Sequence, residues 1–175
     1  AEAVTTRFQG LATQMANIAT ESLEAIQADA RAVNSITAQL AQVNGQLLKK
    51  NSAERQPPEL LDRRDQLLRE LSEYAEINTA FDTVGRVKIS LTESNSRGVL
   101  LDGDNASQLR IVQKPNNPAA LDYTLAGPQK SEVIGGIGSG SLSGYASFYE
   151  RTLNAVNTEL DRLAFIFSDA VNDIQ

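Results

Sequence analysis

Few side chains in this sequence are of types that carry out chemistry. The chain has no histidine and no cysteine, so it lacks the commonest general base, the commonest metal ligand and any thiolate nucleophile. Three groups remain whose residue types and spacing could form a site. They are a glycine-rich stretch, a set of carboxylates and a cluster of arginines.

The glycine-rich stretch, Gly135–Gly140, lies before the last predicted helix. A glycine-rich loop at a helix N-terminus can cradle a phosphate. A phosphate-binding loop of the Walker type needs Lys and then Ser or Thr directly after the glycines, but Leu142, Ser143 and Gly144 follow here. A dinucleotide-binding loop needs a preceding parallel strand and an acidic residue further on. We therefore interpret the stretch as a hinge that joins the β region to the helix.

The carboxylates Glu93, Asp102 and Asp104 all fall in the central third of the chain. Two carboxylates can act together in hydrolysis. The run Asp102-Gly103-Asp104-Asn105 is more typical of a turn, however, and a calcium loop would need a closing Glu and flanking helices. We predict no catalytic, cofactor-binding or metal-ligating residue, no cofactor, and a protein that is not an enzyme.

The arginine cluster alternates with acids along a predicted helix. Its members are Arg63, Arg64 and Arg69, interleaved with Asp62, Asp65 and Glu70. Two interpretations stay open: a solvated, salt-bridged face, or a surface that orients a partner subunit. The net charge of -6 and a pI near 4.7 argue against nucleic-acid binding.

Long apolar stripes predict the helices that would position these groups. The first helix should run from about residue 4 to residue 50, roughly 70 Å at the α-helical rise. A polar connection over 51–56 and the pair Pro57-Pro58 predict a turn into a second helix that ends near residue 75. So short a connection implies an antiparallel hairpin. The second helix, about 30 Å long, cannot cover the whole first helix.

A heptad stripe also marks the last helix, after an N-cap at Ser141 or at Ser147, the latter in a capping box with Glu150. The stripe continues up to Gln175, so we expect it to extend into a longer, assembly-forming protein. Its members alternate steps of four and three: Tyr149, Leu153, Val156, Leu160, Leu163, Phe167, Ala170 and Ile174.

The helical period disappears between residues 77 and 134. Val87, Ile89 and Leu91 alternate with polar residues, which is typical of a half-buried strand, and turn signals separate further short strands. We predict a mainly α fold with an inserted small antiparallel β region (α+β). Residues 1–76 and 141–175 would form a discontinuous helical bundle, and residues 77–140 the inserted β region with its glycine-rich hinge. No apolar run reaches membrane-spanning length.

Two segments resemble the flagellar hook-associated protein 1 family. The first is Pro57–Ser72, PPELLDRRDQLLRELS. The second is the glycine-led run Gly138–Gly144, followed by a helix that ends in AFIFSDAVN, although Ser141 and Ser143 stand where that family has more Gly or Lys. The order of long helix, leucine-rich helix, small sheet and glycine-led helix is also that of the family.

The resemblance implies a structural subunit of the bacterial flagellum at the hook–filament junction, with the long-helix bundle of flagellin-like axial proteins. Such proteins leave the cell through the flagellar type III export channel without a cleaved signal peptide. The implied partners are other axial proteins, namely the hook protein, the second junction protein and copies of the chain itself. An export chaperone that binds a further C-terminal segment is also implied. We expect no nucleic acid and no membrane insertion.

The resemblance further implies that the last helix runs antiparallel to the first, with Ala1 and Gln175 at the same end of the bundle. Two alternatives belong to the same class of flagellar axial proteins. A flagellin or the second junction protein would have the same kind of helical bundle. An unrelated coiled-coil adaptor or receptor signalling bundle is a further alternative, against which the inserted sheet argues.

Overall fold

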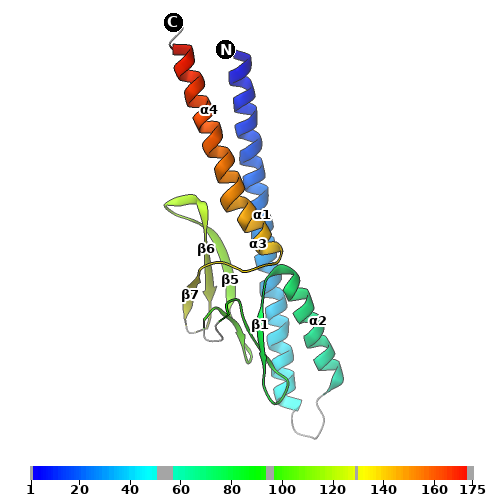
Figure 1. Ribbon diagram of the computed structural model, residues 1–175. Helices are drawn as coiled ribbons and strands as arrows, with labels where there is room; N and C mark the ends of the chain where they lie inside the picture. The colour runs from blue at the N-terminus through cyan, green and yellow to red at the C-terminus, as the bar shows by residue number, and fades with distance from the viewer. Residues whose placement is uncertain (1, 51–56, 94–96, 129, 173–175) are drawn as a thin grey trace.

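The computed structural model describes residues 2–50, 57–93, 97–128 and 130–172 of the chain. Two long helices, α1 (Glu2–Lys50) and α2 (Pro58–Tyr74), come first. Seven strands follow in the described ranges, and the chain then returns through α3 (Ser141–Ser147), a π-helical turn η1 (Phe148–Leu153) and α4 (Asn154–Asn172). The described elements form an elongated molecule in which the strands lie beside one end of α1 (Figure 1).

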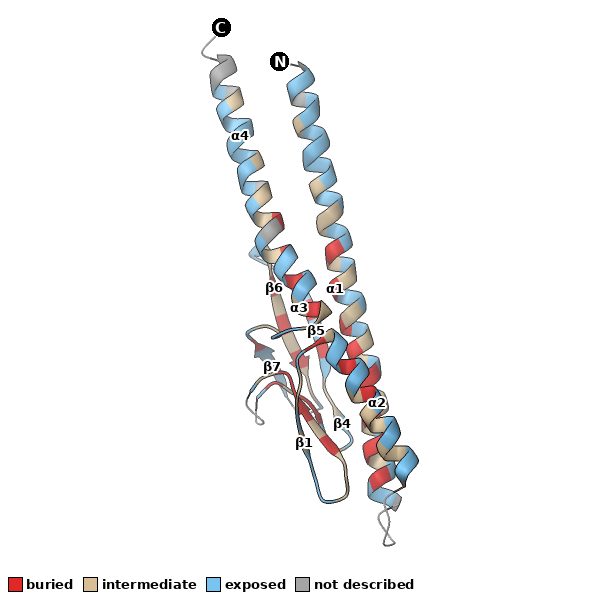
Figure 2. Ribbon diagram, turned by 45° about the vertical axis from the view of Figure 1, so that its right-hand side comes forward, coloured by how far each residue is buried: buried red, intermediate tan, exposed pale blue. Residues whose placement is uncertain are grey.

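Helix α1 is continuous over 49 residues because no proline interrupts it and its apolar residues recur at helical spacing. The buried members of its stripe lie in the second half of the helix: Ile26, Ala30, Val33, Ile36, Leu40, Val43 and Leu47. Helix α2 begins with Pro58 in its first turn, where the missing N–H is not needed, and buries Leu67 and Leu71. It lies beside the second half of α1 (Figures 1 and 2). The predicted connection at 51–56 lies outside the described residues.

The strands form two antiparallel sheets within the predicted β region. The first has the order β1 (Asn78–Phe81), β2 (Val87–Ser90), β3 (Val99–Asp102) and β4 (Asn105–Ala106). The second comprises β5 (Gln108–Lys114), β6 (Asn117–Ala126) and β7 (Ser131–Ile134). The sheets separate at Ser107, whose N–H donates to the carbonyl of Leu100. The sequence pattern missed this point because β4 is too short to show an alternation.

One apolar core joins the helices to both sheets. It receives Leu40 and Leu47 from α1, Leu67 and Leu71 from α2, Ile89 and Leu101 from the first sheet, Leu109 and Leu125 from the second, and Leu142 and Leu153 from the returning helix. Each of these leucines and isoleucines is almost fully buried, which contributes roughly 1.5–3 kcal/mol per side chain. The sheets are therefore packed against the helical bundle and are not a loose appendage.

The returning helix begins differently from the prediction. Gly140 occupies the N-cap position of α3, with no side-chain capping bond, and Ser147 lies inside the helix. The predicted capping box is therefore wrong, because Glu150 accepts a hydrogen bond from the Leu121 N–H instead. The predicted stripe is also only partly inward-facing, since Leu163 is 45% exposed.

The direction of the returning helix agrees with the prediction. Helix α4 runs antiparallel to α1, and the described ends of the two helices, Glu2 and Asn172, lie at the same end of the molecule (Figure 1). Ala1 and Gln175 themselves lie outside the described residues. No helix in the described ranges is both long and apolar enough to span a bilayer.

Candidate functional site

The first half of α1 and the whole of α4 project together from the body of the molecule (Figure 1). We call this pair, residues 2–21 and 154–172, the helical arm. Among its described residues none is buried, and the first buried residue of α1 is Ser22 (Figure 2). Large apolar side chains are exposed along it: Val4, Leu11, Leu163, Phe165 and Ile166, with Phe165 at 72%. A run of exposed apolar side chains of this kind is typical of an interaction surface.

An inner seam holds the two helices of the arm together. The rings of Phe8 and Phe167 lie 6.3 Å apart between centroids, at an interplanar angle of 43°. An aromatic pair of this geometry contributes about 0.5–1.5 kcal/mol beyond its buried area. Met15 and Ile18 extend the seam toward the core as partly buried residues. Leu163 belongs to the same stripe of α4 as Phe167 and is still 45% exposed, so the seam leaves part of the arm's apolar surface uncovered.

At the base of the arm, the π-helical turn η1 is fixed to the β5–β6 hairpin by Tyr149. The Tyr149 hydroxyl donates to the carbonyl of Pro118 at 2.8 Å and accepts from Nε2 of Gln113 at 2.5 Å. A π-helical turn places an extra residue in the helix and often marks a functional position. Here it brings the Tyr149 side chain, which is 6% exposed, against the tip of the hairpin.

Two further residues extend this attachment along the hairpin, and we call Tyr149, Glu150 and Asn154 together the hairpin clamp. Glu150 Oε1 accepts from the Leu121 N–H at 2.8 Å, and Asn154 Nδ2 donates to the Ala119 carbonyl at 2.9 Å. Burial, then the negative charge of Glu150 and a hydrogen bond to it, raise the pKa of Tyr123 to about 12. The hairpin therefore sets the point from which α4 leaves the body.

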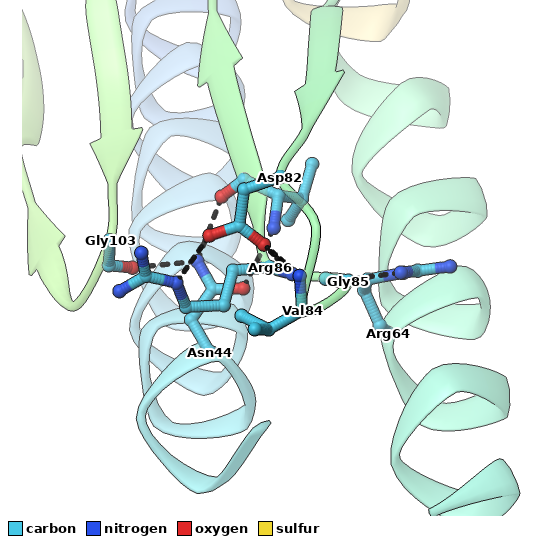
Figure 3. Close-up of polar contacts among 8 residues, drawn as sticks. Asn44, Arg64, Asp82, Val84, Gly85, Arg86 and Gly103 are labelled. Carbon is cyan, nitrogen blue, oxygen red and sulfur yellow. Dashed lines mark hydrogen bonds and ion pairs between the residues drawn. The ribbon is translucent and has the colours of Figure 1, made fainter. Parts of the chain in front are cut away.

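Two asparagines of α1 attach one sheet each to the helix. Asn44 Oδ1 accepts from the Val87 N–H at 2.9 Å, and its Nδ2 donates to the carbonyls of Val87 at 2.8 Å and of Gly103 at 2.6 Å (Figure 3). Asn34 makes the same paired contact with Leu109, at 2.7 Å and 2.9 Å. In each case the side-chain amide forms hydrogen bonds with the backbone N–H and carbonyl of a strand residue, as a neighbouring strand would do.

Arg64 attaches α2 to the β1–β2 hairpin. Its side chain is only 12% exposed, and its Nη1 donates to the Gly85 carbonyl at 2.6 Å (Figure 3). Its Nε and Nη2 donate to Asp65. Its guanidinium also lies 4.6 Å from the centre of the Phe81 ring. A solvated face is therefore wrong for Arg64, although it describes Arg63, which is exposed and donates to glutamine side chains.

The β1–β2 turn next to Arg64 is closed by Asp82. Its carboxylate accepts from the N–H groups of Val84 and Arg86 and from Nε of Arg86 (Figure 3). Partial desolvation opposes ionisation of Asp82, but the hydrogen bonds from Arg86 and Val84 outweigh it and lower its pKa. The turn that receives Arg64 is thus itself fixed by a charged hydrogen-bond network.

The carboxylates considered in the sequence do not assemble into a reactive site. Asp102 is exposed and forms an ion pair with Lys88 at 2.7 Å. Asp104, two residues on, accepts a long hydrogen bond from Asn105, and Glu93 is exposed elsewhere. Within the described ranges no three acidic residues converge as a metal site would require.

The glycine-rich stretch packs closely against the end of α2. Gly140 has φ of +94°, and a Cβ built on it would lie 2.5 Å from the backbone carbonyl atoms of Tyr74. The Ser139 carbonyl accepts from the Glu76 N–H at 3.0 Å. Glycine at position 140 is therefore required by close packing and by backbone conformation. A hinge motion here remains a prediction.

Sequence reasoning missed Asn34, Asn44 and the hairpin clamp. A signal for the asparagines was present, because both stand beside buried apolar residues of the α1 stripe, where a polar side chain needs a partner. The partners themselves, 43 and 75 residues away, leave no trace in the local pattern.

Comparison with known proteins identifies relatives of the whole arrangement. The family model described as the flagellar hook-associated protein FlgK helical domain matches residues 1–175. Flagellar hook-associated protein 1 of Escherichia coli is 29% identical over 155 residues, which is 85% of this chain and 27% of that protein. Its counterpart from Salmonella typhimurium is 27% identical over 147 residues, which is 80% of this chain and 26% of that protein.

A solved structure agrees in fold. The flagellar hook junction protein FlgK from Burkholderia pseudomallei superposes with a TM-score of 0.80 at 23% sequence identity, over 91% of this chain and 29% of that chain. The chain thus spans little more than a quarter of the length of the relatives it matches.

Proposed function

Because the chain belongs to the family of the flagellar hook-associated protein FlgK helical domain, we propose that it is part of a structural subunit at the hook–filament junction of a bacterial flagellum. The descriptions of its relatives, hook-associated protein 1 and hook junction protein, support this proposal. The function would be structural: the subunit would be rigid and would hold its helices at fixed angles to neighbouring subunits in a tubular assembly.

The helical arm is the observation that carries the proposal. Phe165 and Ile166, which are 72% and 49% exposed, belong to a run of exposed apolar side chains of the kind that marks an interaction surface. In the proposal these residues contact neighbouring axial subunits, and the inner seam of Phe8 and Phe167 keeps the arm straight. Residues 1–76 and 141–175 would act as the assembly bundle, and residues 77–140 as the β region that supports it.

The proposed partners are other axial proteins of the flagellum: the hook protein, the second junction protein and further copies of the same subunit. The proposed location is outside the cell, reached through the type III export channel without a cleaved signal peptide. An export chaperone would bind a C-terminal segment of the whole protein that is not in this chain. We further propose that the protein has no enzymatic role.

A motility experiment tests the proposal. The gene is deleted, and the strain is complemented with the full-length protein or with empty vector. The proposal expects that cells with empty vector carry hooks but few attached filaments, and that complementation restores both filaments and swimming. Normal filaments on the hooks of the deletion strain would exclude a junction role.

A further inference from the structure

The dipeptide Asn44-Gly45 lies in the interior of α1, at the contact between that helix and the first sheet. We propose that Asn44 is a deamidation site that folding controls: its side-chain amide is lost when this part of the chain is unfolded and is protected when the protein is folded. The reaction needs only water and the chain itself.

The chemistry uses the backbone nitrogen of Gly45 as the nucleophile. This nitrogen attacks Cγ of Asn44, a new C–N bond closes a five-membered succinimide ring, and the Cγ–Nδ2 bond breaks. The departing amide takes up the proton from the Gly45 nitrogen and leaves as ammonia. Water then opens the ring at either carbonyl and produces aspartate or isoaspartate. Glycine favours the first step because it has no Cβ to crowd the attacking nitrogen and has the freest backbone.

The fold opposes this reaction at each reacting group. Asn44 is 0% exposed, and its amide oxygen and nitrogen are held by three hydrogen bonds to Val87 and Gly103. Gly45 lies in the interior of a helix, where its N–H is engaged by the carbonyl four residues earlier. Ring closure would require Asn44 to leave the helical backbone conformation and to lose its three bonds. Reaction should therefore proceed almost entirely through unfolded or locally opened molecules.

The product would not restore the contact. An aspartate at position 44 can still accept from the Val87 N–H, but it has no donor for the carbonyls of Val87 and Gly103. It would instead place a negative charge beside two carbonyl oxygens in a buried position. An isoaspartate would add a backbone atom within α1. A chain that reacts while unfolded is thus selectively hindered from returning to the folded state.

The chain provides two matched controls. Asn34 makes the same paired contact with a strand, but Ser35 follows it, so its cyclisation is hindered by a Cβ. A Cβ built on Gly45 meets nothing within 4 Å, so Gly45→Ala should slow the reaction and leave the fold intact. Trypsin cleavage after Arg31 and Lys49 places both asparagines in one peptide, residues 32–49.

The experiment incubates the full-length protein in mildly alkaline buffer, with and without guanidinium chloride, and follows peptide 32–49 by tandem mass spectrometry. In denaturant, Asn44 should react faster than Asn34, and Gly45→Ala should remove that excess. In native buffer the rate at Asn44 should fall about 100-fold or more, in keeping with the small unfolded fraction of a stable protein. On removal of denaturant, the protease-resistant refolded pool should be depleted of deamidated chains.

Equal rates at Asn44 in native and denaturing buffer would overturn the proposal, because protection would then not come from the fold. It would also be overturned if Asn44 reacted no faster than Asn34 in denaturant. Equal amounts of deamidated peptide in the refolded and unfolded pools would refute the claim that the product hinders folding.

Discussion

Replacing Asn44 by alanine should be among the most destabilising single changes in this chain, although no apolar packing is lost. The substitution removes three hydrogen bonds and leaves the N–H and carbonyl of Val87 and the carbonyl of Gly103 without their partner. The exposed fractions of Asn44 and Val87 are 0% and 1%, so water cannot readily reach the Val87 groups.

The magnitude follows from these groups. A buried polar group left unpaired costs about 1–3 kcal/mol. Gly103 lies in a partly exposed turn, so solvent can satisfy its carbonyl, and two groups of Val87 remain. The expected loss of unfolding free energy is about 3 kcal/mol. For Asn34→Ala we expect about 1–2 kcal/mol, because the contact of Asn34 with Leu109 is only partly buried, whereas that of Asn44 with Val87 is buried.

Urea unfolding followed by circular dichroism, with m-values compared between variants, measures both losses. Gly45→Ala is the matched control, because it changes the neighbouring residue of α1 without a steric clash and should be neutral or stabilising by up to about 1 kcal/mol. We attribute most of the loss to the buried N–H and carbonyl of Val87, which Asn44→Ala leaves without hydrogen-bond partners. A loss below about 1 kcal/mol for Asn44→Ala, or a larger loss for Asn34→Ala than for Asn44→Ala, would refute this reasoning.

Three further changes test other contacts. Gly140→Ala should lower the unfolding free energy measured in urea by about 2–4 kcal/mol, because φ of residue 140 is +94° and the new Cβ would clash with the backbone. In the control Gly144→Ala, the new Cβ meets no atom within 4 Å and should cost nothing. Arg64→Met should cost about 2 kcal/mol and the exposed Arg63→Met less than about 0.5 kcal/mol; equal losses would contradict the attachment of α2 to the β1–β2 hairpin through Arg64. The raised pKa of Tyr123 favours its neutral form in the folded state, so its contribution is present below the ordinary tyrosine pKa of 10.0 and is lost as the pH rises toward about 12. Tyr123→Phe should flatten that part of a pH–stability curve, and an unchanged slope would contradict the assignment.

The long helices could be predicted from the sequence because their signal is local. The apolar stripe of α1 and the Pro57-Pro58 start of α2 each reflect interactions within a few residues of each other. The strand at Val87 is recognisable for the same reason. The division into two sheets is not, because it depends on a switch at Ser107 within a very short strand.

The contacts that position these elements depend on long-range pairing. In the sequence Arg64 is one of three similar arginines, and only the approach of the β1–β2 hairpin separates it from Arg63. Tyr149 falls on the predicted inward stripe and is buried, but the π-helical turn and the bond of its hydroxyl to Pro118 depend on the hairpin. Local periodicity carries no information about such partners.

The central claim is that the exposed apolar residues of the helical arm form assembly contacts. The direct test expresses the full-length protein with Leu11→Ser and Ile166→Ser in a deletion strain, and counts filaments attached to hooks by electron microscopy. Val133→Ser, at a 67% exposed residue of β7 outside the arm, is the control. The account predicts that the arm variant folds and is exported but supports few filaments, while the control supports normal numbers. Normal filament numbers with the arm variant would contradict it.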